Sequence, residues 1–224
     1  MHPIKKFYYR AYQVVFDLGS RVLPWRKPEV VGGAGSTEKI PELLRGCDVH
    51  KVLIVSGRHT GASLVPPIRA KIEAAGIAAV HFDGVRANPT IEIIEQVRDT
   101  YLAEGCYGLL AVGGGSPMDT AKAAAARIVR PNRSVEQMTG LFKVMRPLPP
   151  FIAVPTTAGS GSETTIAAVI TNEKTHHKHA LMDFCLVPRY AVLDAKLTED
   201  LPPATTAQTG MDALTHAVEA YVSV

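Results

Sequence analysis

Three consecutive glycines, residues 113–115, join an apolar segment to an Ala-rich one. Segment 108–112 is typical of a buried strand, and segment 121–128 is typical of a helix. Glycine has no Cβ, so a ligand can approach the main chain closely, and a helix N-terminus offers unpaired N–H groups and the positive end of a dipole. The turn therefore predicts a phosphate or pyrophosphate site. A glycine-rich turn without a ligand is the alternative, because the spacing is not the GxGxxG fingerprint.

The residues after the glycines predict how this helix begins. Ser116 has the right chemistry for the N-cap, and Pro117 suits the first helical position, where a missing N–H costs nothing. Asp119 would then be the third residue and complete a short capping box.

A second polar loop, residues 155–163, follows the apolar segment 151–154. It consists mainly of small hydroxyl residues and glycines, which can wrap closely around a polar ligand. A flexible linker is the alternative, but an apolar strand precedes the loop and a β-rich segment, residues 164–170, follows it.

Asp212 and His216 lie four residues apart in a predicted helix that runs from about Ala204 to the end of the chain. Residues at this spacing share a helix face, so the carboxylate and the imidazole can converge on one divalent metal such as Fe(II) or Zn(II). Two ligands are too few for a tight site, and a surface pair is the alternative. For the histidines at 176, 177 and 179, solvated imidazoles at a hairpin edge are favoured over a metal cluster.

Short apolar runs alternate with amphipathic segments over most of the chain. We expect strands at 51–55, 77–82, 108–112, 151–154 and 190–194, helices at 63–75 and 90–104, and a hairpin that pairs 178–182 with 164–170. This alternation predicts right-handed βαβ units on a parallel sheet. Ligands of such sheets bind at the carboxyl ends of the strands, where the turns at Gly57 and Gly113 fall.

Composition excludes several classes of protein. The net charge of +3 is too small to indicate a nucleic-acid partner, and no apolar run reaches the length of a membrane span. Three widely spaced cysteines indicate neither a disulfide framework nor a clustered zinc site. We therefore expect a reduced, cytoplasmic protein with no membrane span.

The first thirty residues are basic, with six Lys and Arg against Asp17 and Glu29. One interpretation is a membrane-surface segment anchored by aromatic side chains. The anchors would be Phe7, Tyr8, Tyr9 and Trp25. The other interpretation, which we favour at this point, is a basic surface extension that docks on the protein through these aromatics.

Taken in order, segments 113–122, 155–163 and 210–219 resemble the iron-containing (group III) alcohol dehydrogenases. The resemblance covers about residues 31–224. It implies a Rossmann-like α/β dinucleotide-binding domain with a parallel sheet at residues 31–200, after a basic extension at 1–30. Residues 201–224 would be the first helix of an incomplete, all-helical metal-binding domain.

The resemblance also implies roles for individual residues. The pyrophosphate would lie on Gly114, Gly115 and Ser116, and the ribose and nicotinamide on Thr156, Thr157 and Ser160. Thr165 and Lys178 would lie near the cofactor, and Asn88 beside its adenosine half. Asp212 and His216 match the first two metal ligands of the family, with Fe(II) preferred and Zn(II) as the alternative. The chain ends before the family's two further histidine ligands.

Gly57 bears on the choice between NAD and NADP. Many NAD-preferring members of the family carry an Asp at the end of this strand, where it binds the ribose hydroxyls and repels a 2′-phosphate. Without that carboxylate the barrier to NADP is absent, and Arg58 can offer a bidentate donor to a phosphate. The sequence slightly favours NADP(H), with NAD as the alternative.

The implied activity is hydride transfer between a small alcohol or aldehyde and NAD(P), with the metal polarising the substrate oxygen. We expect a homodimer for the full-length protein. A polyol or glycerol-phosphate dehydrogenase, a dehydroquinate-synthase-like lyase and a non-catalytic dinucleotide-binding module are the alternatives. We expect little activity from the chain alone, because its metal site is incomplete and the apolar side of its last helix, at Met211, Leu214 and Val218, lacks a partner.

Overall fold

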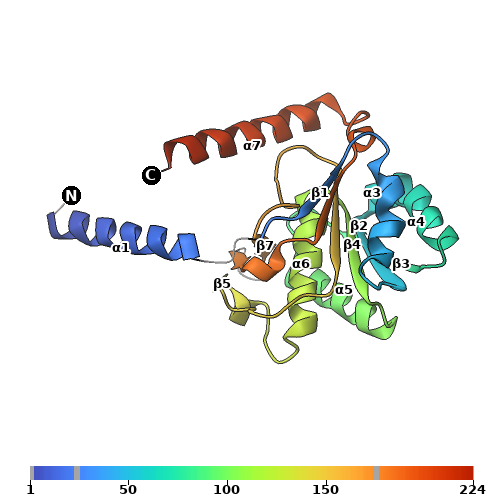
Figure 1. The fold of residues 1–224 in the computed structure, drawn as a ribbon, viewed down its shortest axis with the longest axis horizontal. Coiled ribbons are helices and arrows are strands. Elements are labelled where there is room, and N and C mark those ends of the chain that lie inside the picture. The colour runs from blue at the N-terminus through green and yellow to red at the C-terminus, as the bar shows by residue number, and fades with distance from the viewer. Residues whose placement is uncertain (1–2, 23–25, 174–176, 224) are drawn as a thin grey trace.

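The computed structural model describes residues 3–22, 26–173 and 177–223. Its body is a six-stranded sheet in the order β1-β9-β6-β4-β2-β3, with all neighbouring strands parallel and helices on both faces (Figure 1). The predicted Rossmann-like parallel sheet is therefore confirmed.

The elements of this body follow the predicted alternation. The strands are β1 (Glu29–Gly32), β2 (Lys51–Gly57), β3 (Ala78–Val85), β4 (Gly108–Gly113), β6 (Phe151–Pro155) and β9 (Tyr190–Leu193). The helices are α2 (Ile40–Arg45), α3 (Arg58–Ser63), α4 (Val65–Ala74), α5 (Ile91–Ala103) and α6 (Gly115–Val129). The 3₁₀ segments are Ser36–Lys39, Glu136–Met138, Phe184–Leu186 and Ala195–Leu197. The helix expected at 63–75 starts at Val65, because the prolines at 66 and 67 suit a first helical turn and no later position.

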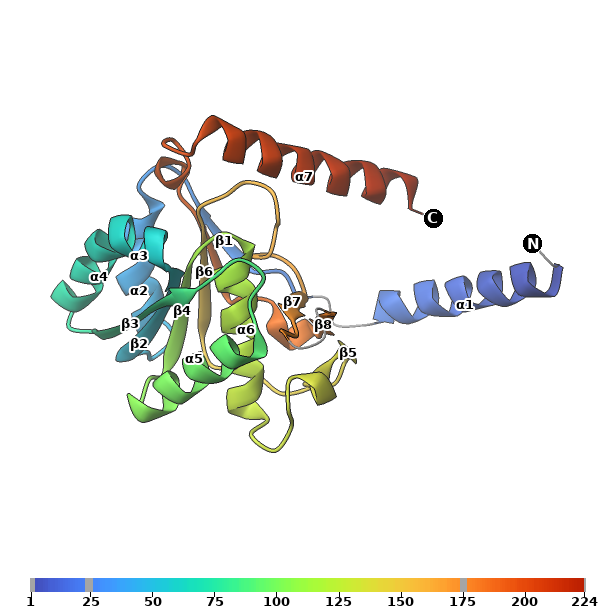
Figure 2. The same cartoon turned by 180° about the vertical axis from the view of Figure 1, so that it is seen from behind.

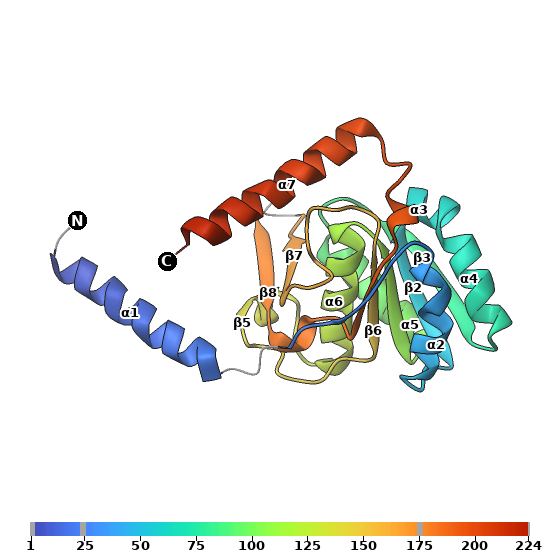
Figure 3. The ribbon, with the colours of Figure 1, turned by 45° about the horizontal axis from the view of Figure 1, so that its top comes forward.

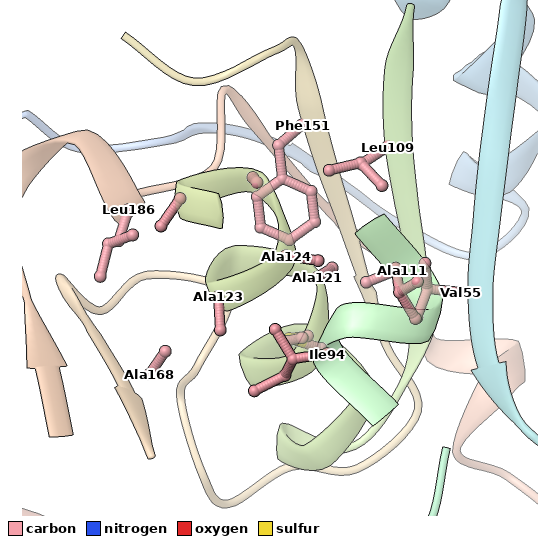
Figure 4. Packing of buried hydrophobic residues seen from close by; sticks show 14 of the residues in the cluster. Val55, Ile94, Leu109, Ala111, Ala121, Ala123, Ala124, Phe151, Ala168 and Leu186 are labelled. Carbon is pink, nitrogen blue, oxygen red and sulfur yellow. The ribbon is translucent and has the colours of Figure 1, made fainter. Parts of the chain in front are cut away.

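Each central strand buries both of its faces. On one side Leu109 and Ala111 of β4 pack with α5 and α6, and on the other side Leu110 and Val112 pack with α2 and α4. Figure 4 shows the first of these clusters, in which small side chains of α6, including Ala121, lie beside β4. Alanine lets α6 approach the sheet closely, so the N-terminus of α6 is held at the carboxyl edge of β4.

The direction of winding reverses beside β2. Strand β3 pairs with one edge of β2 and β4 with the other, so the connection through α5 crosses over β2. Such a reversal opens a crevice at the carboxyl ends of the strands, which is the usual ligand position on an open parallel sheet. Gly57 ends β2 and Gly113 ends β4, so both predicted turns lie at this crevice.

A second, three-stranded sheet covers the outer side of α6. It consists of β5 (Gly140–Leu141), β8 (Lys178–Met182) and β7 (Ala167–Thr171). β7 and β8 are antiparallel, which confirms the expected hairpin. Ala168 and Ile170 of β7 are buried against α6, and a bridge between Thr171 and Thr90 connects the hairpin to the start of α5.

Helices α1 (Pro3–Val22) and α7 (Pro203–Val222) extend away from the body (Figures 2 and 3). The side chains of Phe7, Tyr8 and Tyr9 are 52–76% exposed, so the predicted docking through these aromatics is wrong for the described residues. The reason is that they lie on a helix that extends away from the body (Figure 2). Trp25 lies outside the described residues. Within the described part of the chain, no helix has the length and apolar character needed to cross a membrane. The division into domains stays a prediction.

Asp194, directly after β9, holds the segment that follows β1 against the end of the sheet. Its carboxylate accepts hydrogen bonds from the backbone N–H groups of Gly35 and Thr37 at 2.8 and 3.1 Å, and from the Thr37 hydroxyl at 2.7 Å. The Lys196 N–H adds a fourth at 3.2 Å. Burial by itself raises the pKa of Asp194, but these four donors outweigh burial and lower it below the usual value.

We predict that Asp194→Ala lowers the free energy of unfolding by about 2–4 kcal/mol at neutral pH, because buried donors lose a charged acceptor. Since the pKa is lower in the folded state, the stabilisation is complete above about pH 4 and disappears as the pH falls through the folded pKa. Urea unfolding of both proteins across this range measures the difference. The exposed Asp200→Ala is the control, and a constant difference down to low pH would contradict the prediction.

Candidate functional site

The turn into α6 requires glycine at its first position. Gly113 has φ +148°, and a Cβ there would lie 2.7 Å from Cγ of Pro117. α6 begins at Gly115 with Gly114 as its N-cap, and no side chain caps it. The predicted capping box is wrong: Ser116 is the second helical residue, because the glycines let the helix start two residues earlier. The backbone N–H groups at this end are thus not closed off by a capping side chain.

Asp119 and Lys122 attach α6 to the loop that follows β6. The Asp119 carboxylate accepts hydrogen bonds from the Ser162 hydroxyl at 2.7 Å and from the Val169 N–H at 3.1 Å. The fully buried Lys122 ammonium lies within 2.6–3.0 Å of the carbonyl oxygens of Ser162, Thr165 and Ala167 and the Thr165 hydroxyl. These bonds hold residues 162–169 against the helix.

Burial perturbs both ionisable groups. It lowers the pKa of Lys122 to about 8, against the opposing effect of the negative charges of Asp119 and Glu163. It raises the pKa of Asp119, against the hydrogen bonds from Ser162 and Val169 and the charge of Lys122. The four oxygen atoms around the Lys122 ammonium favour its charged form, which has three N–H donors.

A cavity of about 630 Å³ lies between the N-terminus of α6, the loop after β6, the β7–β8 hairpin and α7. It brings together eight of the thirteen residues that the sequence predicts for the site. These are Asn88, Gly115, Ser116, Ser160, Thr165, Lys178, Asp212 and His216. Asp119 and Ser162 also line it, so the residues that attach the loop face the same space.

The remaining predicted residues lie outside this cavity. Gly114 faces Thr157, whose hydroxyl would be 3.3 Å from a Cβ at position 114. Thr156 is buried and its N–H donates to the Gly113 carbonyl, whereas Thr157 lines a separate cavity of about 300 Å³. Gly57 is the N-cap of α3 and lines neither cavity.

Arg58 lies in a neighbouring cavity of about 560 Å³. Arg86, Asp83 and Thr90 line it too. The loop at residues 86–90 therefore contributes to both spaces, since Asn88 lines the larger one. Asn88 has φ +55°, a left-handed conformation that asparagine tolerates better than most residues.

The predicted metal ligands are neighbours on α7. His216 Nε2 lies 3.8 Å from Asp212 Oδ1, and both side chains are about half exposed. Among the residues that the structure describes, no group of three or more His, Cys, Asp and Glu side chains is placed to hold a metal. His177 and His179 thus form no such group, and His176 lies outside the described residues. A carboxylate and an imidazole fit a divalent metal but supply only two ligands.

The sequence did not predict that Lys122 and Asp119 attach α6 to the loop after β6, or that Ser162 is a contact of both. A single lysine within the otherwise apolar run 121–126 is the signal that was available, because an Ala-rich buried face does not normally hold a charge. Its partners are 40–45 residues away, so no local pattern identifies them.

We predict that Lys122→Met lowers the free energy of unfolding by about 3 kcal/mol or more, because one buried and three partly buried oxygen atoms lose their donor. Lys51→Met is the matched control: Lys51 forms a partly exposed ion pair with Glu104 at 3.0 Å, which is worth less than about 1 kcal/mol. Thermal or urea unfolding measures both changes. Equal losses in the two variants would show that the buried hydrogen bonds contribute nothing special.

Known proteins share this architecture. The family profile described as "Iron-containing alcohol dehydrogenase" matches residues 27–195. Lactaldehyde reductase of Escherichia coli (strain K12) is 36% identical over 193 residues, which cover 85% of this chain and 50% of the relative. NADPH-dependent butanol dehydrogenase of Clostridium saccharobutylicum is 36% identical over 202 residues, which cover 87% and 50%.

The structural comparison agrees. The structure of an alcohol dehydrogenase from Oenococcus oeni matches with a TM-score of 0.86 and 36% identity, over 91% of this chain and 54% of the other. The chain spans about half the length of the curated relatives that it matches. Together with the parallel sheet and the cavity at the N-terminus of α6, these matches show that the chain belongs to the iron-containing alcohol dehydrogenase family.

Proposed function

We propose that this chain is the dinucleotide-binding part of a metal-dependent alcohol dehydrogenase, which transfers a hydride between a small alcohol or aldehyde and NAD(P). The cavity carries this proposal. It combines an uncapped helix N-terminus, hydroxyl side chains and the Asp212–His216 pair in one space that begins at the carboxyl end of β4. Two relatives, named as a lactaldehyde reductase and an NADPH-dependent butanol dehydrogenase, support the substrate class and the cofactor.

The residues at the α6 N-terminus fit a pyrophosphate. A Cβ at position 115 would lie 3.2 Å from the Ser160 hydroxyl, so the glycine leaves open a space that any side chain would fill. The backbone at residues 114–116 would bind the pyrophosphate with the help of the helix dipole. Ser160, Thr165 and Lys178 would contact the rest of the cofactor, and Asn88 its adenosine half.

Thr156 and Thr157 would affect the cofactor indirectly, by holding the glycine turn in place. Thr156 donates its N–H to Gly113, and the Thr157 side chain backs Gly114, so both fix the turn rather than line the larger cavity. A role at the ribose and nicotinamide, as the family resemblance implies, remains a prediction for these two residues.

Asp212 and His216 would hold a divalent metal, Fe(II) or alternatively Zn(II). Further ligands would come from a part of the protein that corresponds to the half of the relatives not spanned by this chain. When bound, such a metal stabilises negative charge on the substrate oxygen, which favours hydride loss to the nicotinamide. The residues of this chain position the cofactor and contribute two of the metal ligands. A homodimer and a cytoplasmic location are part of the proposal.

We also propose that the site accepts NADP(H). Gly57 brings no carboxylate to the end of β2, and the guanidinium groups of Arg58 and Arg86 line the neighbouring cavity. The carboxylates of Asp83, Glu92 and Glu173 line it too, so the proposal rests on the two guanidinium groups and not on the net charge of the cavity. Guanidinium groups bind a phosphate through two parallel hydrogen bonds. NAD remains the alternative.

Titration of the chain with NADPH and NADH, followed by cofactor fluorescence, tests the cofactor proposal. We predict that Gly115→Asp weakens both affinities by about tenfold or more, because a side chain and a negative charge enter the pyrophosphate space. Arg58→Ala weakens NADPH binding by about tenfold and leaves NADH binding unchanged.

Gly32→Asp is the control, because it adds the same charge at an exposed position with nothing within 4 Å. Unchanged NADPH affinity in Gly115→Asp would refute the pyrophosphate assignment. Equal loss of NADPH and NADH affinity in Arg58→Ala would refute the phosphate contact.

For the metal, we predict that the 224-residue chain binds Zn(II) weakly and oxidises no small alcohol at a measurable rate, because only two ligands converge. Isothermal titration, with Asp212→Asn as the reference, measures the binding, and formation of NAD(P)H in the presence of Fe(II) or Zn(II) measures the activity. Tight binding or robust oxidation by this chain would show that the two-ligand assignment is wrong.

A further inference from the structure

Helix α1 precedes the region that the family profile matches, which starts at residue 27. It extends from the α/β body in all three views (Figures 1, 2 and 3). The dinucleotide-binding fold is complete without it, since β1 begins at Glu29. A function for α1 must therefore be sought in its own surface.

One side of α1 is apolar and exposed. Phe7, Ala11, Val14 and Leu18 recur at spacings of four, three and four residues, so they share a helix face. Phe7 is 76% exposed, and Val14 and Leu18 are each 67% exposed. Tyr8 and Tyr12, 65% and 58% exposed, flank this stripe. We call these six residues the apolar side of α1; exposed apolar patches of this kind mark interaction sites.

A second side of α1 is polar, with the exposed Tyr9 at its border, and the segment around the helix is positively charged. Arg10, Gln13 and Asp17 are exposed and recur at spacings of three and four residues. Residues 1–27 hold six of the 24 Lys and Arg residues and one of the 21 Asp and Glu residues. This segment therefore carries a charge of +5, whereas residues 28–224 carry −2. The positive net charge of the chain resides entirely in the segment that bears the exposed apolar side.

We propose that α1 is a membrane-surface helix that lies in the plane of an anionic lipid surface. The apolar side enters the boundary between headgroups and acyl chains, and the basic residues face the lipid phosphates. Tyrosines flanking the stripe suit this depth, because each combines an apolar ring with a hydroxyl that stays in the polar layer. Since the helix is too polar to cross a bilayer, it lies on the surface and does not span it.

Charge favours a lipid over a second copy of this chain. Pairing the apolar sides of two α1 helices would bring two +5 segments together, whereas an anionic bilayer neutralises each one. The inference does not depend on the cofactor or the metal, so it can fail while the proposed function holds.

Co-sedimentation of the 224-residue protein with vesicles tests the inference. We expect binding to vesicles of equal parts phosphatidylcholine and phosphatidylglycerol, weaker binding at high salt, and none to phosphatidylcholine alone. Phe7→Ser/Leu18→Ser weakens binding by about a hundredfold, and Lys5→Gln/Lys6→Gln by about thirtyfold. Gln13→Ser on the polar side binds as the unmodified protein does. Urea unfolding of each variant checks that the body remains folded.

A second measurement locates the apolar side directly. Trp25 is the only tryptophan, so Phe7→Trp/Trp25→Phe moves the fluorophore onto the stripe. We expect its emission to shift to shorter wavelength on anionic vesicles and not on phosphatidylcholine. No vesicle binding, equal binding to both lipids, or no emission shift at position 7 would overturn the proposal. The proposal would also be overturned if the protein bound no vesicles and instead formed a stable dimer that the double variant Phe7→Ser/Leu18→Ser dissociates.

Discussion

The hydrogen bonds of the buried Lys122 ammonium are the interaction on which the cavity depends. α6 is fixed to the sheet by its alanines, and Lys122 fixes residues 162–167 to α6, so two walls of the cavity are held at a constant separation. The buried ammonium has lost its hydration water, and three carbonyl oxygens accept the hydrogen bonds that water would otherwise accept. A leucine at this position would pack as well but would leave the carbonyl oxygens of the loop without donors.

The first two turns of α6 carry three charged features: the positive end of the helix dipole, the Asp119 carboxylate and the Lys122 ammonium. The uncapped N-terminus at Gly114 and Gly115 is positive because of the helix dipole, and Asp119 and Lys122 follow within two turns. Asp119 is committed to Ser162 and Val169, so its carboxylate does not satisfy the terminal N–H groups. A helix end without a capping side chain must find acceptors elsewhere, and under the proposed function the pyrophosphate is that acceptor.

Periodicity in the sequence predicted five of the six strands of the main sheet, because each of the five is an apolar run. The short elements β1, α2 and α3 were not predicted, because segments of four to six residues show too little periodicity. Contacts between distant residues were not predictable. Local preference suggested a cap at Ser116, but the φ of +148° at Gly113 moves the helix start to Gly115. The partners of Lys122 lie on a loop whose path depends on the whole sheet. The resemblance implies that Thr156 lies at the ribose and nicotinamide; in the structure it is buried, and its backbone N–H continues the pairing with β4.

The exposed apolar residues of α7 and α1 need different partners to cover them. α7 contributes Asp212 and His216 to the cavity, and the relatives have a further half that this chain does not span. Under the proposed function, the corresponding part would cover Met211, Leu214 and Val218. α1 has no such explanation, because it precedes the matched region and none of its described side chains lines the cavity. Its apolar side also coincides with the concentration of positive charge, which α7 lacks. Burial in a second protein half would account for exposed leucine and valine but not for that charge, whereas an anionic surface accounts for both.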